Sequence, residues 1–292
     1  SNSGKLETLG NYSSGITLIK KNAGKVLVNN EGDAVINGSF SHGIYLDTQG
    51  GDIQVQSSKG DITTSGDTSH GIFVNNKSAA DNTLVINNSS NISTTGARTG
   101  SNNSAAAIRV TQEGDGKINL TNSGNISTKG IEARNIYINA LGNSAVEVNN
   151  SGSLTSENSS AVGIYSQGDV LITNTGNISA KNKADSKQEV SGHGIEGISR
   201  TGNINIQHLA GDITVENNAQ NQQSHGIVAG GGTNTEVARS ADILIGSKAN
   251  IDATQGNSAV FLKTVKEGSV NINQGATVKG GNDAGVHFEV EN

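Results

Sequence analysis

Four of the six histidines occupy one position of a repeated segment, two residues before an isoleucine. They are His42, His70, His193 and His225. His42 and His70 fall on consecutive repeats, as do His193 and His225, so each pair could stack about 5 Å apart in neighbouring strands. Two imidazoles at that spacing could bind zinc or titrate near neutral pH. The pattern therefore makes a metal site or a pH sensor the first chemical hypothesis.

The same position in other repeats indicates a structural role. Small or apolar residues occupy it there: Ala106, Val162 and Ala284. A position that accepts both histidine and apolar residues is typical of a protein interior, and no third metal ligand is evident. We therefore predict that the four histidines fill a corner of the core, that no metal is bound and that the chain uses no cofactor.

The carboxylates do not form the cluster that a glycan-cleaving enzyme needs. The aspartates at strand starts are spread along the chain: Asp52, Asp61, Asp169, Asp212 and Asp242. Other repeats carry Asn125 or Asn177 in the equivalent place, which favours a role in turns. The sequence also lacks the Gly-x-Ser-x-Gly and His-Glu-x-x-His motifs. We predict that the chain is not an enzyme, with a β-helical glycan-active enzyme as an alternative.

One outward position collects most of the aromatic side chains. Strand side chains alternate between the two faces of a sheet, so the residue after each repeat isoleucine should point outward. Along the chain this position contains Thr17, Tyr45, Phe73, Arg109, Tyr137, Tyr165, Glu196, Val228, Phe261 and His287. Exposed aromatics in a stripe are typical of a contact surface, and a ladder of mutually stacked rings is the alternative. The candidate ligand-binding residues are Tyr45, Phe73, Arg109, Tyr137, Tyr165 and Phe261.

Two further surface features accompany the stripe. The insertion from Lys181 to Ser191 precedes a stripe-bearing strand, and loops on a rigid scaffold often determine specificity. It adds three candidate binding residues: Lys181, Lys183 and Lys187. Another strand has a hydroxyl-rich outward position: Thr63, Ser93, Ser127, Thr155, Ser179, Thr214, Asp252 and Lys279. We interpret this second row as a solvated face, with self-association as an alternative.

These positions require three short strands that recur in a fixed order. The isoleucines of the first strand are 28 residues apart in two runs: Ile16, Ile44 and Ile72, and Ile108, Ile136 and Ile164. The second strand alternates apolar residues, as in Ile118 and Leu120, and the third follows an Asn or Asp, as at Ile126. Hydrophobic residues make up only 32% of the chain and Pro is absent. A thin core extended along an axis needs few apolar residues per cross-section, and proline would interrupt its ladders.

The sequence therefore predicts an all-β fold, a right-handed single-stranded parallel β-helix with three strands per coil. We expect about nine to ten coils forming one solenoid over residues 1–292, since each coil buries its apolar face only by stacking. A β-propeller is the alternative, but it requires four strands per blade of about 40–45 residues.

The repeats resemble those of bacterial autotransporter passenger domains. The resemblance covers nearly the whole chain, through the Ser-His-Gly-Ile segments and through Asn122 to Ser127 and Asn174 to Ser179. It implies a passenger that crosses the outer membrane through a C-terminal barrel and folds outside, at the bacterial cell surface or after secretion. The barrel and a signal peptide are expected to be absent from this sequence, which begins at Ser1 and contains no Met.

The resemblance implies a non-catalytic exported virulence factor or adhesin that binds a host-cell or extracellular-matrix protein or glycan. The alternatives are a released passenger that acts as a soluble agonist of a host receptor, or a self-associating surface protein. The net charge of −6 and the absence of a basic patch argue against nucleic acid and against anionic membranes. The sequence has no apolar run of 18 residues, so we expect no membrane insertion by this chain. The acidic charge also favours basic partners over anionic glycans.

Overall fold

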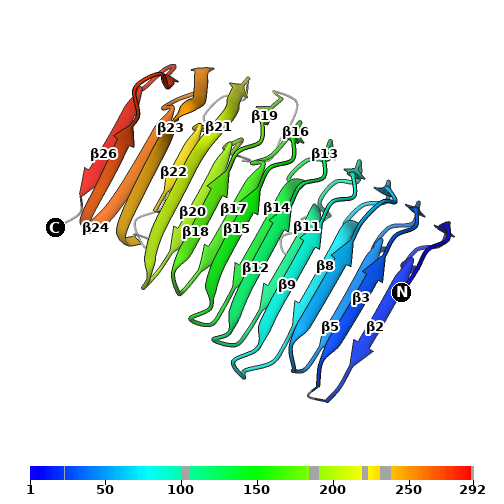
Figure 1. Ribbon diagram of the computed structural model, residues 1–292. Coiled ribbons are helices and arrows are strands. Elements are labelled where there is room, and N and C mark those ends of the chain that lie inside the picture. The colour runs from blue at the N-terminus through cyan, green and yellow to red at the C-terminus, as the bar shows by residue number, and fades with distance from the viewer. Residues whose placement is uncertain (23, 100–104, 184–190, 219–222, 231–237, 291–292) are drawn as a thin grey trace.

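The computed structural model describes the whole chain except residues 23, 100–104, 184–190, 219–222, 231–237 and 291–292. The described residues form strands and connecting turns, without a helix. Each strand pairs in parallel with its counterpart in a neighbouring coil, and the coils stack into a rod with the two termini at opposite ends (Figure 1). The predicted parallel β-helix is confirmed. No helix of the described part is long and apolar enough to span a membrane.

Three strands per coil divide the rod into three faces. Face 1 contains β2 (Ile16–Lys20), β5 (Ile44–Thr48), β8 (His70–Asn76), β11 (Ala106–Gln112), β14 (Arg134–Ala140), β17 (Val162–Ser166), β20 (Ile195–Ser199), β22 (Ile227–Ala229), the first part of β24 (Val260–Ile272) and β26 (Val286–Val290). Among the described residues it therefore has ten strands, in agreement with the predicted number of coils.

Face 2 contains β3 (Val26–Asn30), β6 (Ile53–Ser57), β9 (Thr83–Asn88), β12 (Lys117–Asn122), β15 (Ala145–Asn150), β18 (Val170–Asn174) and parts of β21 (Asn203–Asn217), β23 (Ala238–Gln255) and β24. Face 3 contains β1 (Leu6–Thr8), β4 (Ala34–Ile36), β7 (Ile62–Thr64), β10 (Ile92–Thr94), β13 (Ile126–Thr128), β16 (Leu154–Ser156), β19 (Ile178–Asn182), the later parts of β21 and β23, and β25 (Thr277–Lys279).

The core is a thin column of β-branched residues with a polar ladder at one corner. Ile44, Ile72 and Ile108 stack in register and are fully buried. At the corner between faces 2 and 3, the Asn122 side-chain Nδ2 donates to Asn150 Oδ1 at 2.8 Å and is one of several such links between coils. Because a buried amide is costly unless it is paired, the ladder satisfies polar groups that the narrow core cannot exclude.

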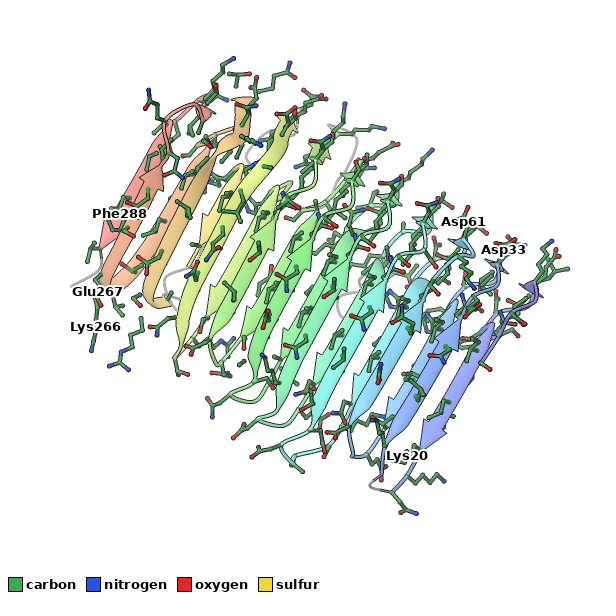
Figure 2. The ribbon with its side chains drawn as sticks, viewed as in Figure 1. Lys20, Asp33, Asp61, Lys266, Glu267 and Phe288 are labelled. Atoms are coloured by element: carbon green, nitrogen blue, oxygen red, sulfur yellow. The ribbon has the colours of Figure 1, made fainter. Side chains whose placement is uncertain are left out.

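The first and last coils lack a neighbour on one side. Phe288 and Val290 of β26 are 45% and 47% exposed, although their counterparts in central coils are fully covered. Figure 2 shows Phe288 on the last strand of the rod. The apolar interior is therefore complete only where coils lie on both sides, as expected for a solenoid.

The register of face 1 differs from the prediction at one coil. The regular spacing predicts that Ile164 pairs with Ile136, but Ile136 pairs with Val162, and Ile138 with Ile164. A slip of one residue would turn the whole strand inside out, whereas a slip of two residues keeps apolar side chains inside. Ser156 and Val162 are two residues closer in the chain than their ladder partners Thr128 and Ile136, so the strand takes this second register without loss of its core.

Candidate functional site

The four repeated histidines lie inside the rod at the start of face 1, as expected. All four are buried, and they form two stacked pairs. The ring centroids of His42 and His70 are 4.9 Å apart, and those of His193 and His225 are 5.4 Å apart. The equivalent residue of the intervening short coil is Ser160, which accepts a hydrogen bond from the His193 N–H. The sequence assignment of Val162 to this position was wrong because of the register of β17.

Each of these histidines accepts a backbone hydrogen bond from the next coil. The Nδ1 atom of His42 accepts from the N–H of His70 at 3.1 Å, and Nδ1 of His70 accepts from the N–H of Ala106 at 2.9 Å. His193 and His225 accept in the same way from the following coils, at 3.0 and 3.1 Å. An imidazole nitrogen accepts only while it is unprotonated. The ladder therefore requires neutral rings.

Burial keeps these rings neutral. It lowers the pKa of His42 to about 4 and the pKa values of His193 and His225 to about 3. Burial also lowers the pKa of His70 well below its ordinary value. With Nδ1 of each ring engaged by the backbone, the geometry supports a fold-stabilising role. The described residues contain no group of three or more His, Asp or Glu side chains arranged to hold a metal.

The outward stripe is continuous over four coils of face 1. Tyr45, Phe73, Arg109 and Tyr137 are direct neighbours in the ladder, and we call these four residues the aromatic row. The rings of Tyr45 and Phe73 have centroids 5.4 Å apart. The Arg109 guanidinium lies 5.2 Å from the Phe73 centroid and 5.6 Å from that of Tyr137. All four side chains are half-buried. The row is thus a stacked ladder that still presents one edge to solvent.

The row ends at Gly163, which corrects the predicted place of Tyr165. Gly163 is the ladder neighbour of Tyr137, whereas Tyr165 pairs with Asn139 in the next outward position. A Cβ on Gly163 would lie 2.8 Å from Nε of Arg134. Glycine therefore leaves the space that the Arg134 side chain occupies.

Arg134 connects the row to Tyr165, and the sequence interpretation missed it. Its guanidinium lies 4.9 Å from the Tyr137 centroid and 5.4 Å from that of Tyr165. Arg134 Nη2 donates to the Tyr165 hydroxyl at 3.0 Å, and that hydroxyl donates to Glu196 Oε2 at 2.6 Å. Burial raises the pKa of Tyr165 well above its ordinary value. Arg134 stands two residues before Ile136, the histidine position, and that spacing was the signal for it.

A small hollow opens where Tyr165 departs from the row. It has a volume of about 150 Å³ and spans the ends of β14, β17 and β20. Its lining consists of Tyr137, Asn139, Ala140, Leu141, Tyr165, Ser166, Gln167, Ile198 and Arg200. The hollow thus combines two aromatic rings with carboxamides and one arginine, on three successive coils.

Phe261 lies apart from the aromatic row. In the ladder its neighbours are Val228 and His287, and its ring centroid is 5.0 Å from that of His287. Val228 is buried, so the predicted contiguous stripe is divided by non-aromatic residues at Gly163, Glu196 and Val228. The structure places Phe261 in a separate aromatic contact near the C-terminal end.

Lys181 lies on face 3 rather than beside the row, and Lys183 follows directly after the same strand. Lys181 belongs to β19, not to a loop, and its ammonium lies 2.8 Å from Glu216. Lys183 pairs with Glu157 at 2.6 Å. Lys187 lies outside the described residues. The hydroxyl row of face 3 is outward and in register, as predicted for Thr63, Ser93 and Ser127. The Lys181–Glu216 and Lys183–Glu157 ion pairs are solvent-exposed links between neighbouring coils.

The scattered aspartates act in turns. Asp52 Oδ1 accepts the N–H of Thr83 at 3.0 Å, and Asp169 Oδ1 accepts that of Asn203 at 2.8 Å. Asn125 accepts the N–H of Ser153 in the same manner. Asp33 and Asp61, which Figure 2 shows at one corner of adjacent coils, are linked by the same bond. The predicted interchange of Asp and Asn at these corners is confirmed, because both accept a backbone N–H from the next coil.

Comparison with known proteins gives no identification: no family model, curated protein or solved structure matches the chain.

Proposed function

We propose that the chain is the exported passenger region of a bacterial autotransporter and acts as a non-catalytic adhesin at the cell surface or after release. Its partner is a protein or glycan of the host-cell surface or extracellular matrix. The observation that carries the proposal is the aromatic row: four stacked, half-buried side chains in a chain with only four Tyr and four Phe. Aromatic and arginine side chains dominate binding energy at protein interfaces.

The row is suited to binding because stacking fixes its side chains before a partner arrives. A Tyr or Arg held by its neighbours loses less conformational freedom on binding than an isolated exposed side chain. The carboxylates support a non-catalytic role. Asp52 and Asp169 each accept a backbone N–H from the next coil, and several coils separate them along the rod.

A cell-binding assay with a row variant tests the proposal. The double variant Tyr45→Ser with Phe73→Ser removes two adjacent rings, and we expect host-cell binding to weaken by about 1–4 kcal/mol. The matched control is Thr63→Ala with Ser93→Ala, which changes two neighbouring outward positions of face 3. Thermal melting checks that both variants fold.

Parent-like binding by the folded serine variant would overturn the proposal. Phe73 also contacts the buried histidines, with its centroid 4.9 Å from that of His70. If the serine variant does not fold, Tyr45→Leu with Phe73→Leu keeps apolar cover over the histidines and is judged by the same criterion.

A further inference from the structure

Tyr137 presents an edge, rather than a face, to the hollow beside the aromatic row. Arg109 is its ladder neighbour on one side. On the other side the ladder neighbour is Gly163, and the Arg134 side chain occupies the space that a larger residue would need there. The two guanidinium groups thus cover the two faces of the Tyr137 ring, at 5.6 and 4.9 Å from its centroid. A ligand in the hollow therefore cannot stack on this ring.

Tyr165 supplies a second ring whose polar group is already engaged. Its ring plane meets that of Tyr137 at 73° with centroids 5.8 Å apart, and both rings line the hollow. The Tyr165 hydroxyl accepts a hydrogen bond from Arg134 and donates one to Glu196. The Ser166 hydroxyl donates to a backbone carbonyl of the preceding coil at 2.8 Å. These two hydroxyls are therefore committed to bonds within the chain.

The rest of the lining favours a neutral, apolar group. Leu141 is 53% exposed and borders the hollow together with Ala140 and Ile198. Arg200 also lines the hollow, but it already has an interaction partner in the chain, so it gives no preference for a charged ligand. Among the described residues that line the hollow, none is Asp or Glu.

The size of the hollow matches one ring. Sites that enclose a whole drug-sized ligand have volumes of about 300–1,000 Å³. At about 150 Å³ this hollow accommodates a single side chain of a larger partner. The edge of an aromatic ring carries partial positive charge and its face partial negative charge. The Tyr137 edge therefore attracts the face of another aromatic ring.

A sugar ring fits the hollow less well than an aromatic side chain. The hydroxyls of a sugar must find hydrogen-bond partners when they leave water. The hydroxyls of Tyr165 and Ser166 are engaged within the chain, and the faces of Tyr137 are covered. The contacts of the lining thus favour a protein partner over a glycan.

We propose that the hollow receives a single aromatic side chain of a host protein. The face of that ring packs on the Tyr137 edge, and Leu141, directly after β14, covers it. Asn139 and Gln167 bind backbone N–H and C=O groups beside the ring, because a carboxamide both donates and accepts. Aromatic side chains in such pockets often dominate the affinity of protein interfaces. This inference rests on the proposed binding function and selects a protein as its partner.

Titration of the purified chain with small probes tests the ligand class. The probes are N-acetylphenylalaninamide, the corresponding leucine and alanine amides, and methyl β-galactoside. We expect the phenylalanine amide to bind with millimolar affinity and to shift the methyl resonances of Leu141 and Ile198. The leucine and alanine amides should bind about threefold or more less tightly, because they lack the ring.

Three results of this titration would overturn the inference. The first is binding of the galactoside as tightly as the phenylalanine amide. The second is equal affinity for the leucine and phenylalanine amides, which would remove the preference for an aromatic ring. The third is no binding of the phenylalanine amide up to about 20 mM.

Substitution of the exposed leucine tests the assigned place. Leu141→Asp sets a carboxylate against the bound ring, and we expect binding of the phenylalanine amide to weaken by about tenfold or more. Leu27→Asp is the matched control, because Leu27 is 56% exposed on β3 and is not among the residues that line the hollow. Thermal melting checks that both variants fold. If Leu141→Asp does not fold, Leu141→Ala takes its place. Unchanged affinity in the folded Leu141 variant, or an equal loss in Leu27→Asp, would contradict the assignment.

The two proposals fail in different experiments. Tyr45 and Phe73 do not line the hollow. If their serine variant loses host-cell binding but the phenylalanine amide does not bind, the row is a binding surface and the assigned ligand is wrong. If the amide binds but that variant still binds cells like the parent, the hollow is a side-chain site and the row is not the cell-binding surface.

Discussion

One pair of buried histidines, His42 and His70, lies behind the aromatic row on face 1, yet the histidines and the row have different roles. His70 and Phe73 both belong to β8, and their centroids are only 4.9 Å apart. His70 is fully buried and bonded to the backbone of the next coil, whereas Phe73 keeps an exposed edge. Because side chains alternate along a strand, one short segment can supply both the fold and a surface. The buried histidines should therefore control stability, and the aromatic row should control binding.

Acid should have the largest effect on stability, and it should act through the buried histidines rather than through the aromatic row. The folded-state pKa values of His42, His193 and His225 lie at about 3 to 4, below the value near 6.5 of an unfolded chain. Between these pH values the unfolded state binds more protons, so stability is full above about pH 6.5 and is lost as pH falls. Each histidine contributes up to about 1.4 kcal/mol per pH unit.

Urea denaturation between pH 7 and pH 5 measures this loss before the carboxylates titrate. A flat urea midpoint over that range would contradict the neutral histidine ladder. His287 provides an internal contrast: hydrogen bonding to Asp283 raises its pKa, so its contribution is present at low pH and is lost as pH rises. That contribution should be small because the ring is only partly buried.

Removal of one ladder histidine should have the next largest effect. His70→Ala leaves the Ala106 N–H without its acceptor and creates a cavity, so we expect a loss of about 2–4 kcal/mol in the free energy of unfolding. Lys77→Ala, on the exposed end of the same coil, should cost little. Equal melting temperatures for the two variants would show that the histidine column does not stabilise the fold.

Gly163→Ala should lower stability by an intermediate amount, because it disturbs the contacts between the aromatic row and the hollow. The new Cβ would lie 2.8 Å from Arg134 Nε, and the guanidinium must move from between its two rings. We expect a loss of about 1–3 kcal/mol. Gly4→Ala is the control, since nothing lies within 4 Å of its added Cβ. Thermal melting of both variants, with the parent, checks the prediction; an unaffected Gly163→Ala variant would exclude a steric need for glycine.

Tyr45→Ser should have the smallest effect on stability. The ring stacks on Phe73 and lies 5.2 Å from His42, so we expect a cost of about 1 kcal/mol. Urea denaturation measures this cost, and host-cell binding measured in parallel should fall by more than stability does. A variant with greatly reduced stability and unchanged binding would reverse the roles assigned to the buried histidines and the aromatic row.

Sequence patterns predicted the periodic parts of the molecule well. The recurrence of Ile16, Ile44 and Ile72 identified both the strand and its register, because each coil repeats the same burial. The histidine position was correctly placed inside for the same reason. Periodicity failed at Tyr165, because a slip of two residues preserves the alternation of inward and outward side chains and leaves no trace in the pattern.

The remaining errors concern single side chains rather than repeats. Arg134 occupies a position that holds histidine in other coils. Its contacts with Tyr137 and Tyr165 depend on the space beside Gly163 and not on a repeated motif. Lys181 was expected in a loop because the insertion begins after the regular spacing ends, but β19 continues through Asn182 and pairs with β21. Such details follow from local packing, which a one-dimensional repeat does not encode.

Hydroxyl-radical footprinting of the folded chain, with and without host-cell membranes, tests the central claim most directly. The aromatic row predicts that Tyr45, Phe73 and Tyr137 become protected when membranes are present. Tyr12, which is 78% exposed in the first coil, serves as an internal reference and should stay reactive. Unchanged reactivity of the row residues in a sample that binds the membranes, or protection of Tyr12 alone, would contradict the assignment of binding to face 1.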